Sequence, residues 1–149
     1  MANYTDMDIA YLAGIIDGEG AFLAYIYTIY FQLILKITNT DLRLLEHLQY
    51  KFGGRINGKN AEDTKKKWKP CYILRWSGVE AIKITKEIFP YLIVKKEHAQ
   101  LFLDYPMKWS NGAKTKYRYQ KIPDIDIMAR ESICLKIKKL NEKGVPLSN

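Results

Sequence analysis

The apolar residues of this sequence recur with two spacings, one typical of helices and one typical of strands. Within "IAYLAGII", residues 9–16, the bulky apolar residues lie three or four positions apart, as on one face of a helix. Thr5 and Asp8 form the T-x-x-D pattern that starts many helices. We therefore expect the first helix to begin near Asp6.

Residues 21–37 form a long apolar run that contains almost no charge. Its length is at the lower limit for a membrane span, but Gln32 and Lys36 would be costly in lipid. Its richness in Tyr, Ile, Phe and Thr favours strands over a helix. We therefore predict two antiparallel strands with a tight turn near Tyr27 to Tyr30, and no membrane partner.

The remaining pattern extends the order to α-β-β-α-β-β-α-α-α. We predict helices over residues 39–54, 78–92, 95–109 and 124–144, strands over 55–59 and 69–77, and a basic loop over 111–123. Asn39, Thr40 or Asp41 can cap the second helix, and Gly53-Gly54 ends it. This order predicts an α+β fold with an antiparallel sheet and helices on one face, as a single domain over residues 1–149.

The first helix carries small residues where a helix normally carries bulky ones. Ala10, Ala13, Gly14, Asp17 and Gly18 share one stripe, opposite the bulky apolar residues. A bare stripe allows a second backbone to approach closely. Either this helix packs tightly inside its own domain, or its bare face meets a second copy of the chain.

Two acids, Asp17 and Glu19, stand where this helix runs into the first strand. If two such helices cross at their bare faces, two Glu19 side chains meet near a two-fold axis. Carboxylates without nearby His or Cys suit Mg²⁺. The alternative is that both are ordinary solvated or capping acids.

The composition indicates a polyanionic partner. The chain has 149 residues, with 24 Lys and Arg against 16 Asp and Glu, a net charge of +8 and an isoelectric point near 9.4. Cys71, Cys134, His47 and His98 show neither zinc-ligand spacing nor a disulfide framework. We therefore expect a reducing, intracellular location.

The segment "LAGIIDGEG", Leu12 to Gly20, resembles the nine-residue motif of the LAGLIDADG homing endonucleases. The resemblance continues through "ITNTDLRLLEHLQYKFGG", "YILRWSG" and "FPYLIVKKEHAQ". It implies an αββαββα core with a saddle-shaped antiparallel sheet and additional C-terminal helices. It also implies a site-specific double-strand break in DNA by metal-dependent hydrolysis, with Mg²⁺ or another divalent cation such as Mn²⁺ and no organic cofactor. Such cleavage promotes intron mobility.

The resemblance assigns roles to four residues at the end of the motif and of the second strand. Glu19 resembles the essential metal ligand, with the backbone carbonyl of Gly18 beside it. Asn39 aligns with a polar residue that orients water and metal, and it can cap the second helix as well. Asp17 is then structural and bonds across the helix pair rather than binding metal.

Two basic positions complete the implied active site. Lys95 aligns with the basic residue near the scissile phosphate, although the adjacent Lys96 competes for this role if the register differs by one. Arg43 aligns with a second basic residue of the site. A cation at either position would stabilise transition-state charge.

The more polar side of the strands is the predicted DNA-reading surface, because a two-stranded ribbon fits the major groove. The predicted contacts are Tyr25, Tyr27, Tyr30, Gln32, Lys36, Thr38, Asn57, Lys59, Lys67, Lys69, Cys71, Ile73 and Arg75. Lys114, Lys116 and Arg118 of the basic loop would contact phosphates and set the register. Tyr72, Leu74 and Trp76 should point to the core instead.

The chain contains one such motif, and two-motif relatives are roughly twice as long. One motif supplies one metal-binding acid, so the resemblance implies a homodimer, double-stranded DNA as partner and a near-palindromic target. The dimer interface would be Ala10, Ala13, Gly14, Asp17 and Gly18. The host would be an archaeon, with the protein in the cytoplasm, or a eukaryote, with the protein in an organelle.

Three other functions compete with DNA cleavage. The first is an RNA maturase of the same fold, which can coexist with cleavage. The second is a non-cleaving DNA-binding protein, which would normally have lost Glu19. The third is a basic α+β interaction module, which leaves the bare stripe and its acids unexplained.

Overall fold

The structure is a computed structural model, and it describes residues 3–27, 30–58, 69–106 and 124–142. Its first half contains α1 (Asp6–Glu19), β1 (Gly20–Tyr27), β2 (Tyr30–Asn39), α2 (Leu42–Phe52) and β3 (Arg55–Gly58). Its second half contains β4 (Tyr72–Ser77), α3 (Val79–Ile88), a 3₁₀ turn η1 (Phe89–Tyr91), α4 (Lys96–Asp104) and α5 (Asp124–Asn141). The predicted order of helices and strands is confirmed.

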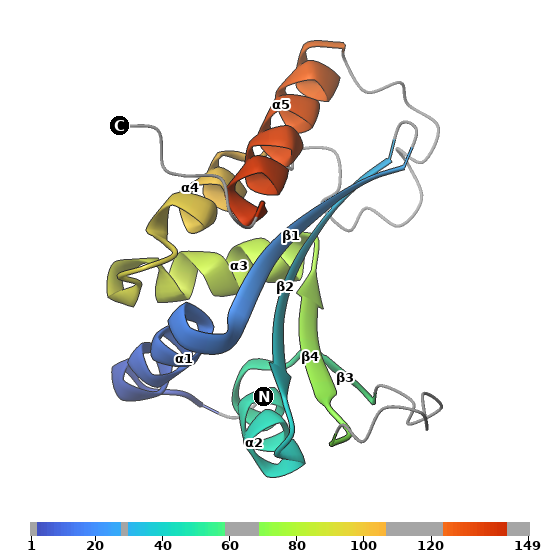
Figure 1. Cartoon of the computed structure of the whole chain (residues 1–149). Coiled ribbons are helices and arrows are strands. Elements are labelled where there is room, and N and C mark those ends of the chain that lie inside the picture. The colour runs from blue at the N-terminus through green and yellow to red at the C-terminus, as the bar shows by residue number, and fades with distance from the viewer. Residues whose placement is uncertain (1–2, 28–29, 59–68, 107–123, 143–149) are drawn as a thin grey trace, which may run out of the picture.

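The four strands form one antiparallel sheet in the order β1-β2-β4-β3. β1 and β2 form a long twisted hairpin, and the helices lie on one face of the sheet (Figure 1). The predicted α+β fold with helices on one face is therefore confirmed.

The core lies between the sheet and these helices. Strand burial alternates: Phe22 and Ala24 of β1, Leu33, Leu35 and Ile37 of β2, and Leu74 and Trp76 of β4 all face the core. One hydrophobic cluster joins them to helical residues from Ile9 to Ile137. The opposite face of the sheet carries most of the polar strand residues, together with the buried Ile34.

Local signals set the helix ends. Thr5 caps α1 in a reciprocal capping box with Asp8, as the T-x-x-D pattern predicts. Asp41 caps α2, and Gly53 ends it with a φ of 71°, a conformation that favours glycine. Pro90 lies in η1, directly after α3.

The start of one strand differs from the predicted one. β4 begins at Tyr72 rather than at Lys69, so Lys69 and Cys71 precede the strand. Tyr72 is only half-buried, although it packs against the core as predicted. The basic loop over residues 111–123 lies outside the described residues.

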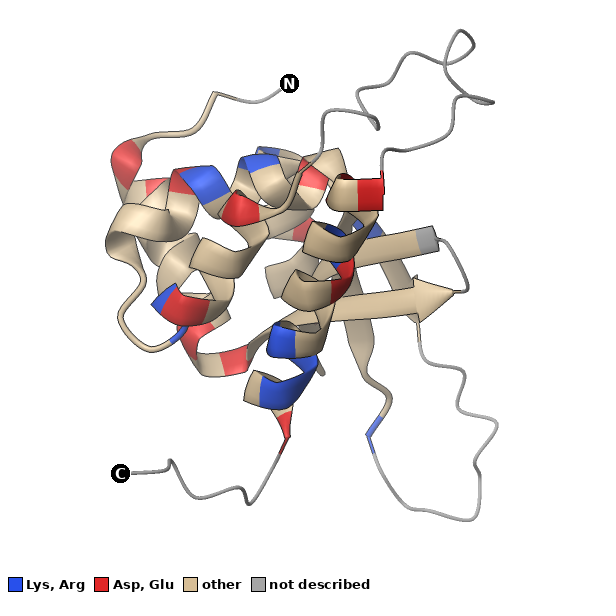
Figure 2. Ribbon diagram, turned by 90° about the horizontal axis from the view of Figure 1, so that it is seen from above, with Lys and Arg blue, Asp and Glu red and all other residues tan. Residues whose placement is uncertain are grey.

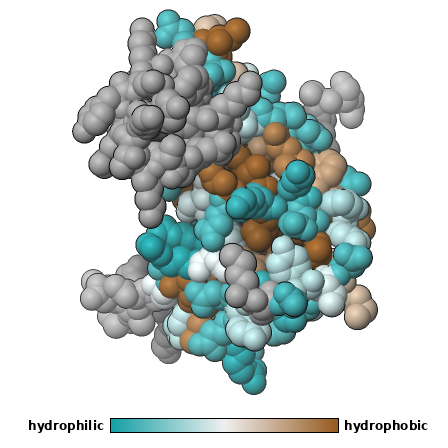
Figure 3. Space-filling model, turned by 180° about the vertical axis from the view of Figure 1, so that it is seen from behind, coloured by the Kyte–Doolittle hydropathy of each residue, from teal (hydrophilic) through white to brown (hydrophobic). Residues whose placement is uncertain are grey.

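No helix in the described part of the chain has the length and apolar character needed to cross a membrane. Apolar side chains do reach the surface. The face seen in Figure 3 carries hydrophobic patches interrupted by hydrophilic side chains.

Candidate active site

The junction between α1 and β1 is too tight for any residue but glycine at position 20. A Cβ on Gly20 would lie 2.7 Å from the Ile16 Cα, closer than real Cβ atoms come to backbone. The chain therefore turns directly from the helix into the strand. Glu19, the last residue of α1, is left exposed beside the sheet.

Asn39, at the end of β2, holds the Glu19 carboxylate. Its Nδ2 donates to Glu19 Oε2 at 2.6 Å, and its Oδ1 accepts from the Asp41 backbone N–H at 2.7 Å. Because the amide is bonded at both ends, its orientation is set. The structure thus brings together two residues that are 20 positions apart and were predicted to share the site.

Asp17 bonds to the segment that precedes α4. Its two carboxylate oxygens accept hydrogen bonds from the backbone N–H groups of Ile93, Val94 and Lys95, at 2.7, 3.1 and 3.0 Å. These partners belong to its own chain, and the expectation that Asp17 bonds across a helix pair stays a prediction.

Lys95 reaches back to the same end of α1. Its Nζ donates to the carbonyl oxygens of Ile16, at 2.8 Å, and of Gly20. Burial lowers the pKa of Lys95, and the nearby Asp17 charge opposes this shift. Lys95 is therefore a half-buried cation at the last end of α1, bonded to the carbonyl of the residue that follows Glu19.

Lys96 takes a different direction. It is the first residue of α4, it is exposed, and its Nζ lies 5.8 Å from the centre of the Phe89 ring. Lys95, rather than Lys96, therefore lies beside the motif in α1, as predicted.

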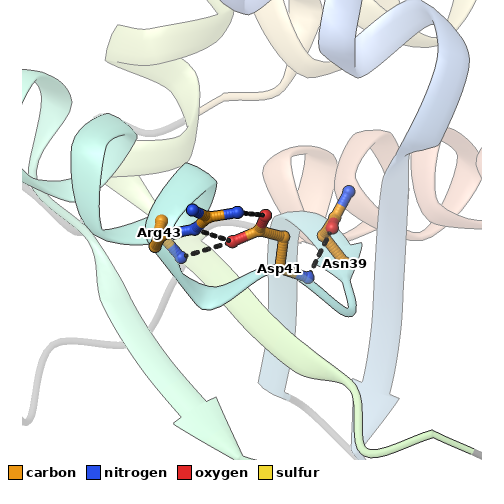
Figure 4. Close-up of polar contacts among 3 residues, drawn as sticks. All are labelled: Asn39, Asp41 and Arg43. Atoms are coloured by element: carbon orange, nitrogen blue, oxygen red, sulfur yellow. Dashed lines mark hydrogen bonds and ion pairs between the residues drawn. The ribbon is translucent and has the colours of Figure 1, made fainter.

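Arg43 is not joined to the Glu19 group by any contact that the structure gives it. Its Nε and Nη2 donate to the two carboxylate oxygens of Asp41, at 3.1 and 2.7 Å (Figure 4). The hydrogen bonds from Arg43 lower the pKa of Asp41, and the same pair raises the pKa of Arg43. Both side chains remain well exposed, so this pair is solvent-screened.

The donor set at the end of α1 fits a hard divalent cation. Carbonyls in the last turn of a helix lack intrahelical partners, so the carbonyl of Gly18 is available beside the Glu19 carboxylate. Oxygen ligands of this type suit Mg²⁺, which keeps several waters and binds substrate phosphates as well. Within the described residues there is no cluster of three or more His, Cys, Asp or Glu.

The open face of the sheet carries a row of basic residues. The strand pairing sets Lys36 of β2 opposite Arg75 of β4, and Arg75 opposite Arg55 of β3. Like charges in directly paired positions destabilise a sheet, so this row favours an anionic partner. β1 to β4 contain no Asp or Glu, and Figure 2 shows no acidic position on the strands.

Arg55 was missed in the sequence. Nothing in "RING" marks it, because its place in the row depends on the pairing of β3 with β4. Arg55 stands two residues before Asn57, so the two side chains lie on the same face of β3. Because Asn57 was predicted to face the DNA, this spacing could have identified Arg55 as well.

The predicted DNA-reading residues that the structure describes lie on or beside this open face. Tyr25 and Tyr27 are exposed, and their rings stack with centroids 6.1 Å apart. Exposed residues of the set are Gln32, Asn57 and Lys69, and half-buried ones are Lys36, Thr38, Cys71, Ile73 and Arg75. For Tyr30 the structure gives only its pairing with Tyr27. Lys59, Lys67, Lys114, Lys116 and Arg118 lie outside the described residues.

The bare stripe of α1 is open to the outside except at Ala13. Gly14 and Gly18 are exposed, and a Cβ on either would meet nothing within 4 Å. Ala10 and Asp17 are half-buried. Ala13 is fully buried in the chain's own core, so its predicted place in a dimer interface is wrong.

Large apolar side chains are exposed on the stripe of the two glycines and in the segment bonded to Asp17. Met7 and Tyr11, on the same stripe, are 81% and 52% exposed, and Ile93 and Val94, held by Asp17, are 85% and 72% exposed. An exposed apolar group of this kind is typical of a protein contact surface.

No protein-family model and no curated protein sequence matches the chain. Solved structures do match. They include the homing endonuclease I-CvuI in complex with its target and calcium (18% identity, TM-score 0.71, 97% of this chain and 87% of that one). They also include the archaeal intron-encoded homing endonuclease I-Vdi141I complexed with DNA (20% identity, TM-score 0.69, 97% and 90%).

A third match is the group I intron-encoded homing endonuclease I-CeuI complexed with DNA (14% identity, TM-score 0.63, 100% and 72%). Other matching structures are described as LAGLIDADG enzymes, among them I-AabMI, bound to uncleaved DNA. This chain therefore has the fold of the LAGLIDADG homing endonucleases, and the predicted fold resemblance is confirmed.

Proposed function

We propose that this chain is a site-specific DNA endonuclease of the LAGLIDADG type. It acts as a homodimer, uses a divalent cation and makes a double-strand break in a long, near-palindromic target, which promotes intron mobility. The observation that carries the proposal is the meeting of Glu19, Asn39 and Lys95 at one helix end, beside an acid-free basic sheet.

Each of the three residues has a distinct role in this proposal. Glu19 and the Gly18 carbonyl hold the cation, and Asn39 fixes the carboxylate through its 2.6 Å bond. A bound Mg²⁺ would lower the pKa of its water and neutralise charge on the phosphate. Lys95 supplies a half-buried positive charge where negative charge develops on the phosphate oxygens.

The open sheet face binds the DNA. The row of Lys36, Arg75 and Arg55 neutralises the charge of the duplex, while Tyr25, Gln32 and Asn57 lie where side chains can reach base edges. Arg43 and Lys69 line a cavity of about 490 Å³ beside the start of α2, together with Tyr72. We assign these two cations to phosphate contacts near the scissile bond, with Arg43 exchanging its partner Asp41 for a DNA phosphate.

The homodimer is supported by the two glycines of α1, because glycine inside a helix lowers the stability of that helix. A helix-interior glycine costs roughly 0.5–1 kcal/mol relative to alanine. Nothing in the described part of the chain needs that space at Gly14 or Gly18. A second α1 helix at this face accounts for both glycines, covers Met7 and Tyr11, and brings a second Glu19 to the first.

The test is cleavage of a plasmid that carries the intron-free insertion junction of the host gene. With Mg²⁺ we expect linear DNA from one cut site, and with a chelator we expect intact plasmid. The matched control is the same plasmid with the intron inserted, which interrupts the target. Cleavage that continues in chelator, or binding of intron RNA without any DNA cutting, would refute the proposal.

A further inference from the structure

We infer that Asp17 is a positioning residue for DNA cleavage that acts through Lys95. This inference rests on the proposed function. Asp17 itself touches neither the DNA nor the cation. It holds the segment from Ile93 to Lys95 against the end of α1, so that the lysine meets the Glu19 site.

Both carboxylate oxygens of Asp17 accept hydrogen bonds from this segment. Oδ2 accepts the Ile93 N–H at 2.7 Å, and Oδ1 accepts those of Val94 and Lys95 at 3.1 and 3.0 Å. Three backbone donors on one carboxylate are charge-assisted bonds, which are stronger than neutral ones. The segment therefore has one favoured position relative to α1.

The start of α4 explains why a remote acid is needed. Lys95 is the N-cap of α4, and no side chain caps this helix locally, since a lysine side chain accepts no hydrogen bond. Asp17, from 78 positions away, accepts instead from the backbone N–H of the N-cap residue Lys95, and a carboxylate is favourable at the positive end of a helix.

Lys95 is held to α1 at two points. Its backbone N–H bonds to Asp17, and its Nζ bonds to the carbonyls of Ile16 and Gly20, which flank Asp17 in the chain. Lys96 shares neither contact and lies over Phe89 instead. The first contact therefore decides which of the two lysines reaches the site.

A double-mutant cycle separates this role from a general effect on folding. The four proteins are wild type, Asp17→Asn, Lys95→Met and the double variant, assayed by single-turnover cleavage with Mg²⁺. The matched control is Asp6→Asn, which removes the same charge from the other end of α1. Thermal unfolding and target affinity are measured for each protein.

We expect Asp17→Asn to slow cleavage by about 10²-fold, because a misplacement near 1 Å costs this much. Target affinity and the Asp6→Asn rate should stay close to wild type. In the Lys95→Met background, Asp17→Asn should cause no further loss, since residues that act as a unit are non-additive. Losses that multiply in the double variant would overturn the inference.

Amide hydrogen exchange provides a readout that needs no cleavage. The amides of residues 93–95 should exchange faster in Asp17→Asn but not in Lys95→Met, and unchanged exchange would overturn the inference. If Asp17→Asn unfolds, Asp17→Glu replaces it, because it keeps the charge but moves the acceptors by one methylene. A wild-type protein that cuts no DNA would refute the proposed function, whereas wild-type cleavage with multiplied losses would refute only the positioning role.

Discussion

The two ends of α1 both carry acids, but the acids do different things. At the first end Asp8 bonds to Thr5 within the same turn, and Asp6 lies beside it, where the helix dipole favours negative charge. At the last end Asp17 and Glu19 lie where the dipole disfavours negative charge. Their partners are Asn39 and the backbone of residues 93–95, which come from other elements.

This difference separates acids that start the helix from the acids that we propose form the active site. The first pair follows from local helix chemistry, and its one remote partner is Lys51 of α2, whose Nζ lies 3.5 Å from Asp8 Oδ2. The second pair opposes the dipole, and its remote partners stabilise it. Residues that break a local rule and are compensated from elsewhere are expected at functional sites. Substitutions at the two ends of α1 should therefore have separable effects on stability and on cleavage.

The largest effect is expected midway between the ends, at Gly14→Leu. The change should break the dimer and abolish cleavage, because a leucine overpacks a close helix contact at about 1–3 kcal/mol per site. The monomer should stay folded, since a Cβ at this position meets nothing within its own chain. Light scattering beside the plasmid assay measures both effects.

The control for Gly14→Leu is Glu87→Leu, an exposed helix position on α3. It should leave both assembly and cleavage unchanged. A Gly14→Leu protein that remains dimeric and cuts normally would mean that the exposed face of α1 is not the interface.

At the last end, Lys95→Met should slow cleavage by roughly 10²–10³-fold, the usual cost of removing one stabilising group from a transition state. Affinity for the target should change little, because most of it comes from the sheet and the phosphate contacts. Lys96→Met is the matched control and should cut at nearly the wild-type rate. If Lys96→Met is the damaging change instead, the assigned register is off by one.

At the first end, Thr5→Ala should lower stability and leave catalysis intact. Loss of a helix N-cap typically costs about 1 kcal/mol, which lowers the melting temperature by about 2–4 °C in a chain of this size. The cleavage rate per folded molecule should be unchanged. A large loss of cleavage without loss of stability would contradict the separation between the two ends.

The smallest effect concerns His98, three residues after Lys95. Burial lowers the pKa of His98, and Lys95 adds to this, while the hydrogen bond to Asn141 and the charge of Glu97 oppose it. The unfolded chain then binds a proton at a higher pH than the folded one. Stability should therefore be full above the ordinary histidine value of 6.5 and fall as the pH drops below it.

Thermal unfolding at a series of pH values measures this dependence. In His98→Gln the melting temperature should depend less on pH below 6.5 than in wild type. His47→Gln, which changes an exposed histidine, serves as the control. A wild-type melting temperature that rises on acidification through this range would mean that the folded protein binds the proton more tightly than the unfolded chain, which contradicts the burial of His98.

Sequence patterns predicted the features that depend on residues close together in the chain. The capping box spans four residues, and the strand parity follows from burial on one face, so both were predictable. Ala13 was assigned to the wrong face although it stands four residues after Ile9 and three before Ile16, spacings that also fit the buried side.

Contacts between distant segments could not be predicted in the same way. The partners of Asp17 are 76 to 78 positions away, and the row of Lys36, Arg75 and Arg55 exists only because of the strand register. The resemblance to a known family pointed to Lys95 and left Lys96 as its competitor. The contacts of the two Nζ atoms place Lys95, not Lys96, at the end of α1. Arg43 was predicted at the site, yet its own neighbour Asp41 holds it.

The central claim is that Glu19 holds the cation for DNA cleavage, and Glu19→Gln tests it most directly. Glutamine keeps the shape of the side chain and removes the charge that binds the cation. Binding and cleavage of one labelled target are measured with Mg²⁺, beside Glu46→Gln, which changes an exposed acid on α2. We predict that Glu19→Gln binds the target as wild type does and does not cut it, whereas Glu46→Gln does both. Equal turnover by Glu19→Gln and wild type would contradict the assignment of Glu19 as the cation ligand.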